Sequence, residues 1–283
     1  MTIFEVRDTE AGRNLRDIVL ERWPALSRMY VRSRIARGGA FVNGQPAVSG
    51  FKPAAGAVVT LAFDVEAMTA MHAEAIPLEI VHEDPALLVV VKPAGMLAHP
   101  ARYAKQGTLA NGLVWHLNRD GGPLVRPIFV HRLDRETSGL LVVAKTLEAA
   151  RWLSRELAAG CFAKRYTAVV SGHPRDCTIE APIGRDPERR PQWGVLAGGK
   201  SARTLLRAME RGAAGTLVEM EPVTGRTNQL RIHCAHIGHP VVGDTAYGGP
   251  EATRLFLHAA SLGFRHPNQT WMSFESPAGF RAG

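Results

Sequence analysis

One short polar segment of the chain, HRLDRETSGLLVVAK, combines a carboxylate with basic and hydroxyl side chains. Asp134 is its fourth residue, and its basic neighbours are His131, Arg132 and Arg135. Positive neighbours favour the ionised carboxylate that a nucleophile or general base requires. The turn at Thr137 could orient this carboxylate through backbone hydrogen bonds. An aspartate at the entry to a strand can equally be a structural Asx-turn acceptor, and the local sequence leaves both roles open.

A group of histidines with one cysteine near the end of the chain has the residue types of a metal site: His233, Cys234, His236 and His239. On a helix, His233 and His236 would be three residues apart and could face one ion. No acidic or cysteine partner is arranged nearby. We therefore predict packed or hydrogen-bonding histidines here and no metal.

The segments on both sides of Asp134 predict an α+β domain with a mixed, mainly antiparallel sheet, from residue 77 to residue 283. Apolar runs or alternation predict strands at LEIVHED, ALLVVVKPAG, GLLVVAK, KRYTAVVSG, ARTLLRAME and GTLVEMEPV. TLEAARWLSRELAAG predicts an amphipathic helix with Thr146 as its N-cap and Gly160 after its last turn. Because helices do not alternate regularly with strands, a doubly wound parallel sheet is not expected.

Residues 1–66 predict a smaller unit of their own, joined to the rest by a linker at residues 67–76. Apolar residues at helical spacing predict a first helix from Asn14 to Trp23, which Pro24 ends. Ser27 is the expected N-cap of a second helix over residues 28–37. AFVNGQPAV then predicts a hairpin that turns at Asn43 and Gly44, and GAVVTLAF predicts a last strand.

The second of these helices carries Arg28, Arg32, Arg34 and Arg37 and no acidic residue. A solvated helix face usually mixes charge signs, so an all-positive one favours a phosphate backbone as its partner. The alternative is a merely basic helical hairpin. From Ala11 to Phe63, through SRMYVRSRIARGGAFVNGQPA, the pattern resembles the αL RNA-binding domain, first described in a ribosomal small-subunit protein.

The composition is that of a globular protein with a basic surplus. The net charge is +8 and the isoelectric point is near 9.9. A basic surplus of this size is compatible with a polyanionic partner and equally with a basic but unspecialised surface. The basic stretch at residues 185–190 is expected to form an exposed loop that contacts either phosphates or solvent alone. Three scattered cysteines indicate no disulfide framework, and the longest apolar run, residues 86–91, cannot span a bilayer. Without a signal-peptide pattern, the cytoplasm is the expected compartment.

The segment around Asp134 resembles, almost letter for letter, the catalytic segment of the RluA-type pseudouridine synthases, HRLDxxTSGLLVxAK. Four other blocks are similar to motifs of that family and occur in the family's order. They are KPAGMLAHP, KRYTAVVSG, GRTNQLRIHCAHIGHPVVGDTAYG and LHAASLGFRHP, which together cover most of residues 77–283. The resemblance implies a pseudouridine synthase fold with an N-terminal αL domain.

The resemblance also implies roles for single residues. Asp134 would be the nucleophile, Tyr166 would lie against the flipped uracil, and Arg231 would be the ion-pair partner of Asp134, its fork able to bind the carboxylate bidentately. Leu230 matches the family's aliphatic position beside Arg231. Arg132 lies where the family has an arginine near the displaced nucleotide.

One position departs from the family, which commonly has histidine where Asn228 stands. Asparagine can donate and accept hydrogen bonds but cannot take up a proton near neutral pH. Contacts to RNA are expected from Arg226 and Asn228, along with Arg132 and the four arginines of the predicted basic helix. His131 and Thr137 are expected to support the site.

The implied reaction breaks the N1–C1′ bond of uridine, rotates the uracil, rejoins it through C5 and removes the C5 proton. It needs neither redox chemistry nor an imported group, and the chain carries no Walker-type loop or GxGxxG fingerprint, so no cofactor is expected. The carboxylate could add to C1′, add to C6 of the base or abstract the 2′ proton. The sequence does not choose among these routes.

Large-subunit ribosomal RNA is the expected partner, with transfer RNA as the alternative, and the protein is expected to be a monomer without membrane contact. Two other function classes compete. A non-catalytic RNA-binding or ribosome-assembly factor could keep the same fold, although Asp134, Tyr166 and Arg231 are intact. A glycosidic hydrolase would require a second catalytic carboxylate, and no acidic residue stands in a comparable block.

Overall fold

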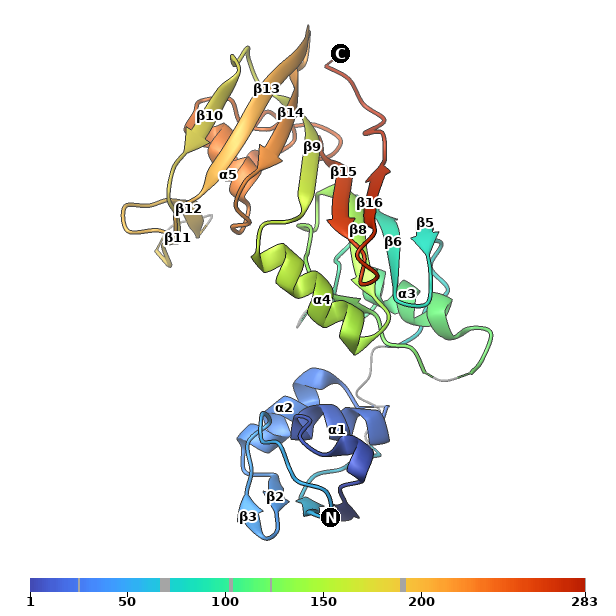
Figure 1. Ribbon diagram of the computed structural model, residues 1–283. Helices are drawn as coiled ribbons and strands as arrows, with labels where there is room; N and C mark the ends of the chain where they lie inside the picture. The colour runs from blue at the N-terminus through green and yellow to red at the C-terminus, as the bar shows by residue number, and fades with distance from the viewer. Residues whose placement is uncertain (25, 67–71, 102–103, 123, 189–191, 283) are drawn as a thin grey trace. The chain divides into compact units, whose positions relative to one another are not determined.

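The computed structural model describes residues 1–24, 26–66, 72–101, 104–122, 124–188 and 192–282 (Figure 1). The chain divides into two compact units, Met1–His72 and Ala73–Gly283. The division falls within residues 67–76, the predicted linker, of which residues 67–71 lie outside the described part. None of the described helices is long and apolar enough to cross a membrane.

The N-terminal unit packs two helices against a small antiparallel sheet. The sheet has the strand order β1-β4-β2-β3. Ser27 accepts a hydrogen bond from the backbone nitrogen of Tyr30 at 3.1 Å, which confirms the predicted N-cap, and the turn at Asn43 and Gly44 has the positive φ angles of a tight hairpin. Strand β1 lies where no element was expected. The elements are β1 (Thr2–Glu5), η1 (Asp8–Glu10), α1 (Leu15–Arg22), α2 (Arg28–Ala36), β2 (Ala40–Val42), β3 (Gln45–Pro46) and β4 (Val58–Leu61).

The apolar faces of both helices form the core of this unit. Ile18 of α1 and Ile35 of α2 are buried against Leu61 of the sheet in one apolar cluster. Burial of this kind contributes about 1.5–3 kcal/mol for each large aliphatic side chain. The unit therefore has a core of its own, built from the periodicity read in its sequence.

The C-terminal unit is built on a ten-stranded sheet with the order β10-β13-β14-β9-β15-β8-β6-β5, to which β7 and β16 add at β8 and β15. Among the described residues, β15 pairs with β8 in parallel and every other neighbouring pair is antiparallel. The predicted mixed, mainly antiparallel α+β fold is confirmed. The strands are β5 (Glu79–Glu83), β6 (Leu87–Lys92), β7 (Ile128–Phe129), β8 (Ser138–Ala144), β9 (Ala163–Val170), β10 (Cys177–Glu180), β13 (Arg203–Gly212), β14 (Gly215–Pro222), β15 (Leu257–Arg265) and β16 (Trp271–Glu275).

The helices of this unit cover the sheet at different strands. Helix α4 packs along β8 and β15, and α5 packs against β13 and β14 (Figure 1). Thr146 caps α4 by accepting from the backbone nitrogen of Ala149 at 3.1 Å, as predicted, whereas α3 lies where no element was expected. The remaining elements are α3 (Leu109–Asn118), α4 (Leu147–Ala158), α5 (Gln229–His236), η2 (Thr245–Tyr247) and the hairpin of β11 (Ile183–Arg185) and β12 (Trp193–Val195).

Strand β8 is buried over its whole length. Its alternate side chains enter two different cores: Leu140 and Val142 pack in the cluster that contains α4 residues, and Leu141 and Val143 pack in the cluster that contains α3 residues. A strand covered on both faces reads as a continuous apolar run, which is what GLLVV shows. The polar segment that carries Asp134 leads directly into this rigid strand.

Gly139 lets β15 approach the beginning of β8. Its φ is +115°, and a Cβ atom there would meet the backbone nitrogen of Ala259 at 2.5 Å. The parallel pairing of β8 and β15 consists of this contact and its neighbour, in which His258 faces Ser138. A side chain at residue 139 would therefore push apart the two strands behind the Asp134 segment.

We expect Gly139→Ala to lower the free energy of unfolding by about 2–4 kcal/mol, because it adds both a steric clash and backbone strain. Gly160→Ala is the matched control: Gly160 also has a positive φ, +75°, but a Cβ atom there would meet nothing within 4 Å. Gly160→Ala should lower the free energy of unfolding by only about 1 kcal/mol. Urea unfolding measures the free energy of unfolding of both variants. Equal losses of stability would contradict the inference that β15 approaches too closely for a side chain at residue 139.

Candidate active site

A cavity of about 580 Å³ opens in the C-terminal unit beside the beginning of β8. Its volume lies within the range of small-molecule sites. The loop before β8, strand β9 and the turn that leads into α5 all contribute to it. The predicted site residues in its lining are His131, Arg132, Asp134, Thr137, Tyr166, Arg226, Asn228 and Leu230.

The Asp134 segment is held in place by backbone contacts and by one buried lysine. The backbone nitrogen of Thr137 donates to the carbonyl oxygen of Asp134 at 3.2 Å. Lys92, fully buried at the end of β6, donates to the carbonyl oxygens of Pro93, Met96 and Arg135 at 2.8, 2.9 and 3.0 Å. Burial lowers the pKa of Lys92 to about 8. This lysine was not predicted; a lysine directly closing the apolar run LLVVV was the available signal.

Two of the three basic neighbours predicted for Asp134 do not act as expected. The Nε2 atom of His131 accepts a hydrogen bond from the backbone nitrogen of Val142 at 3.1 Å, and burial lowers the pKa of His131 to about 3, so this histidine is neutral. The guanidinium of Arg135 donates to the carbonyl oxygen of Gly95 at 3.0 Å instead. The sequence showed proximity along the chain but not the direction of the side chains.

The Asp134 carboxyl lies largely out of water, with a quarter of its side chain exposed. Burial raises its pKa above the ordinary value, and the positive charges of Arg231, Arg132 and Lys92 oppose that rise. The neighbouring cations thus favour the ionised carboxylate, as expected, but desolvation has the larger effect on its pKa.

Arg231 lies on α5, as predicted, but its main partner is another carboxylate. Its Nε and Nη2 atoms donate to the two carboxylate oxygens of Asp244 at 2.7 and 2.6 Å. Its Nη1 atom lies 4.0 Å from Oδ2 of Asp134. The expected ion pair is present at this longer distance, whereas a bidentate fork on Asp134 is wrong. Leu230 is buried in the adjoining core, as expected.

Asn228 contacts Asp134 more closely than Arg231 does. Its side-chain amide lies between the carboxylate and the hydroxyl of Tyr247, 2.8 Å from Oδ2 of Asp134 and 2.9 Å from the hydroxyl. Its backbone is in the left-handed region, with φ 53°. Sequence reasoning had no signal for Tyr247, whose contribution depends on a turn that follows α5.

Tyr166 enters the same cavity from β9. Its ring packs in the two clusters that also contain Leu230 and Leu133, and it is half-buried. Burial, and to a smaller extent the charge of Asp134, raises the pKa of Tyr166 above its ordinary value. The side chain is therefore a neutral phenol at physiological pH.

The histidines near the end of the chain make hydrogen bonds. His233 uses both ring nitrogens, with the hydroxyl of Thr204 at 2.9 Å and the carbonyl oxygen of Ala181 at 3.1 Å. His239 bonds to the carbonyl oxygen of Ser171 at 2.8 Å. The predicted hydrogen-bonding role is confirmed for these two. In the described part of the chain, no three histidine, cysteine or acidic side chains gather as a metal site.

The other basic residues fall into two groups. Arg226, which also lines the cavity, is partly buried and donates to the carbonyl oxygen of Ser201 at 2.9 Å, beside a second hollow that Arg185 and Lys200 also line. Of the predicted loop at residues 185–190, residues 189 and 190 lie outside the described part. The arginines of α2 belong to the N-terminal unit.

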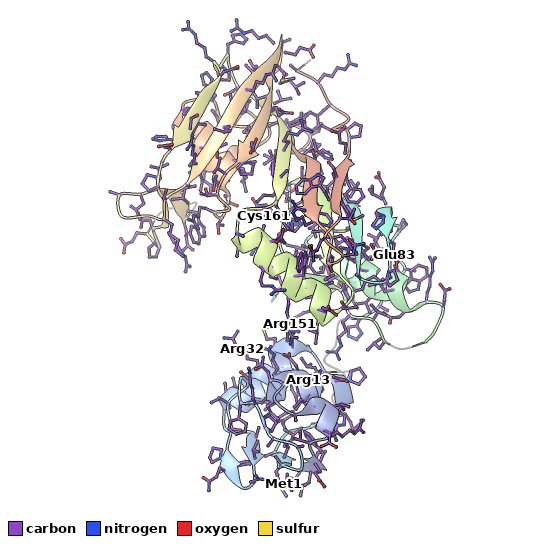
Figure 2. The ribbon with its side chains drawn as sticks, in the orientation of Figure 1. Met1, Arg13, Arg32, Glu83, Arg151 and Cys161 are labelled. Carbon is purple, nitrogen blue, oxygen red and sulfur yellow. The ribbon has the colours of Figure 1, made fainter. Side chains whose placement is uncertain are left out.

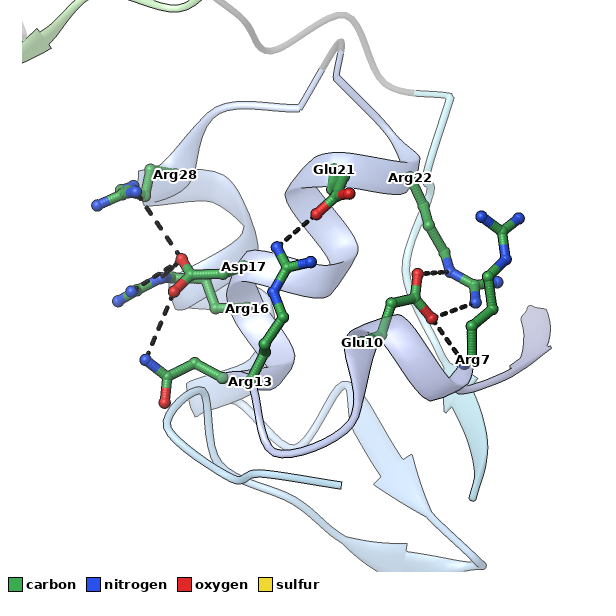
Figure 3. Close-up of polar contacts among 9 residues, drawn as sticks. Arg7, Glu10, Arg13, Arg16, Asp17, Glu21, Arg22 and Arg28 are labelled. Carbon is green, nitrogen blue, oxygen red and sulfur yellow. Dashed lines mark hydrogen bonds and ion pairs between the residues drawn. The ribbon is translucent and has the colours of Figure 1, made fainter. Parts of the chain in front are cut away.

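On α2 the four arginines are exposed, but they are not equivalent. Arg28 lies 3.8 Å from Asp17, a buried acid of α1 that also binds Arg16 (Figure 3). The guanidinium of Arg34 stacks over the ring of Tyr30. Arg32 lies on the surface of the unit (Figure 2), and Arg37 follows the last turn. The all-positive helix thus has an acidic neighbour that its own sequence did not reveal.

The sequence matches the family described as "RNA pseudouridylate synthase" over residues 86–236. It is 41% identical over 260 residues to the "Uncharacterized RNA pseudouridine synthase YlyB" of Bacillus subtilis (strain 168), an alignment that spans 89% of this chain and 86% of that protein. It is 38% identical over 284 residues to the "Ribosomal large subunit pseudouridine synthase D" of Pseudomonas aeruginosa, spanning 94% and 88% of the two chains.

The fold agrees with these sequence matches. The solved structure of "Human RNA Pseudouridylate Synthase Domain Containing 1" superposes with a TM-score of 0.62 at 30% identity, covering 72% of this chain and 85% of that one. The chain belongs to the RNA pseudouridine synthase family. It is therefore an isomerase that converts uridine to pseudouridine in RNA.

We expect Asp134→Asn to stabilise the folded protein at neutral pH. A carboxyl whose pKa is raised by folding contributes stability below its ordinary value of 3.8, and that contribution is lost as the pH rises through the folded value. At neutral pH, folding must therefore bury a charge that the amide lacks. The thermal unfolding midpoint of Asp134→Asn should exceed that of the unaltered protein near pH 7, and the two midpoints should converge near pH 3.

Asp120→Asn is the control for this measurement, because the side chain of Asp120 is 90% exposed. It should leave the midpoint unchanged at both pH values. A destabilising effect of Asp134→Asn at neutral pH would mean that the cations around Asp134 outweigh its burial.

Proposed function

We propose that this protein modifies uridines of large-subunit ribosomal RNA, with Asp134 as the catalytic carboxylate and with the target base moved out of its stack into the cavity. One observation carries the proposal: Asp134 and Tyr166 line the same cavity, together with the exposed Arg132. The ribosomal target follows from relatives named ribosomal large subunit pseudouridine synthase D, at 37–38% identity over most of this chain.

The chemistry needs a carboxylate that can leave water without being neutralised. Asp134 would attack the sugar or the base, or abstract a sugar proton, while the freed uracil turns in place and rejoins through C5. Atoms balance within the substrate, because the C5 proton lost is replaced at N1 by one from solvent or from a side chain. A desolvated carboxylate whose charge is stabilised by nearby cations remains a strong nucleophile, because no water shell must be removed from it.

Tyr166 offers a flat face for the displaced uracil. Stacking of a base on an aromatic ring contributes about 1–3 kcal/mol, which offsets part of the cost of unstacking the target. Because Tyr166 is a neutral phenol, it can remove the C5 proton only as its own hydroxyl proton passes to another group. Arg132 would hold the phosphate of the displaced nucleotide.

The N-terminal unit would act as an αL-type RNA-binding domain, with residues 67–76 as its linker to the catalytic domain. The exposed guanidinium groups of Arg32 and Arg37 can contact phosphates, which adds affinity without reading bases. Tethering of this kind raises the effective concentration of RNA at the cavity. The protein would act as a monomer, and a ribosomal substrate indicates action in the cytoplasm.

We expect Asp134→Ala to reduce tritium release from RNA labelled at uridine C5 by roughly four orders of magnitude. RNA binding, measured by filter retention, should change little, because the phosphate contacts remain. Asp120→Ala serves as the exposed control. Mapping pseudouridine in total RNA with and without the gene then tests the target. Loss of a transfer RNA site alone would contradict a ribosomal substrate.

We expect Arg32→Ala and Arg37→Ala to weaken RNA binding by similar factors on any sequence. Each should also reduce the slope of log affinity against log salt by about 0.7–0.9, the contribution of one phosphate contact. Lys52→Ala removes an exposed charge that does not belong to α2, from a loop that hydrogen-bonds to the start of α1, and should leave this slope unchanged. Unaltered slopes for both arginine variants would argue against α2 as a phosphate-binding surface.

A further inference from the structure

Of the described residues that contact the Asp134 carboxylate, Asn228 lies closest, through its side-chain amide. When its nitrogen faces Asp134, it lies 2.8 Å from Oδ2 and 3.3 Å from Oδ1, and its oxygen accepts from the hydroxyl of Tyr247 at 2.9 Å. Arg231 comes no closer to the carboxylate than 4.0 Å. The direction of the carboxylate is therefore set by an amide and not by the arginine fork.

The opposite orientation of the same amide also satisfies every partner, but only for a protonated Asp134. The carboxyl hydroxyl would then donate to the amide oxygen, the amide nitrogen would donate to Tyr247 at 2.9 Å, and the Tyr247 hydroxyl would donate to the carbonyl oxygen of Trp193 at 3.1 Å. An ionised carboxylate excludes this orientation, because two acceptor oxygens would face each other. The amide can match either state of the acid by turning about one bond.

The surroundings of Asn228 fix its amide at this place. The residue is in the left-handed region, which asparagine tolerates better than most residues, and α5 begins immediately after it. The ring of Tyr247 is itself held by the guanidinium of Arg231, which lies 4.9 Å from the ring centroid. Arg231 is itself bound bidentately to Asp244, so both the ring and the arginine have partners other than Asp134.

We propose that Asn228 is a positioning residue for the reaction: its amide, backed by Tyr247, aims one oxygen of the Asp134 carboxylate into the cavity and stabilises its ionised form. This inference rests on the proposed catalytic role of Asp134. It gives Asn228 a role at Asp134 in addition to the expected contact with RNA. It also gives the asparagine a task that requires a hydrogen-bond donor but no proton uptake.

Several charged or titratable groups act on Asp134 from the elements packed around it, and a test of the amide must leave them in place. They are Arg132 on its own segment, Lys92 at the end of β6, Tyr166 on β9, Arg231 on α5, and Asp244 and Tyr247 on the turn after α5. Substitution of Asn228 removes none of them. A change in the pH profile can therefore be assigned to the amide.

The experiment compares kcat/KM for tritium release as a function of pH in the full-length protein and in Asn228→Gly. The acid limb reports ionisation of the free enzyme's essential carboxylate. Glycine accepts the left-handed backbone but has no amide, so the limb should move to higher pH by roughly one unit, the value of one hydrogen bond to a charged group. Asn228→Asp places two carboxylates together and should move the limb further. Tyr247→Phe should move it in the same direction by less.

Asn43→Gly is the matched control, because Asn43 is also an asparagine in the left-handed region, with φ 49°, in the other unit. Its acid limb should coincide with that of the unaltered protein. If Asp134→Asn abolishes release but Asn228→Gly and Asn228→Asp leave the limb unmoved, the positioning role is wrong and the catalytic role of Asp134 stands. If Asp134→Asn retains activity, the proposed function itself fails.

Discussion

Burial of the Asp134 carboxylate is the constraint on which the catalytic unit depends. A charge that has left water must be compensated by groups that cannot move away, or the site takes up a proton instead. The unit supplies them from separate elements: Lys92 from the end of β6, Arg231 from α5 and the amide of Asn228 from the turn that leads into α5. Arg132 adds a further positive charge from the segment that carries the acid.

The cations around Asp134 are held at a distance by other partners. The ammonium group of Lys92 donates to three carbonyl oxygens, and the guanidinium group of Arg231 binds Asp244 bidentately. Both therefore act on Asp134 through their charge without binding it directly. A carboxylate bound tightly by an arginine fork would be a poor nucleophile, because its lone pairs would already be engaged. The arrangement stabilises the ion and leaves its oxygens available.

The sequence predicted those features that depend on neighbouring residues. Ser27 and Thr146 were recognisable as N-caps because a cap acts within one helical turn, and the antiparallel strands were recognisable from alternation. Tyr166 and Leu230 were assigned through the resemblance of their blocks to family motifs, and both lie in the cavity lining. The bidentate partner of Arg231 could not be predicted, since Asp244 is brought back by a turn after the helix. The neutral state of His131 depends on burial, which no local pattern reveals.

The order of strands in the large sheet has a consequence for how the enzyme matures. Asp134 precedes β8 and Tyr166 lies on β9, yet these strands are not neighbours, because β15 is inserted between them. Synthesis proceeds from the N-terminus, so both residues leave the ribosome well before the strand that spaces them. The N-terminal unit, by contrast, has a core built from residues of the first part of the chain alone. The native spacing between Asp134 and Tyr166 therefore requires β15, a strand that is synthesised after both residues.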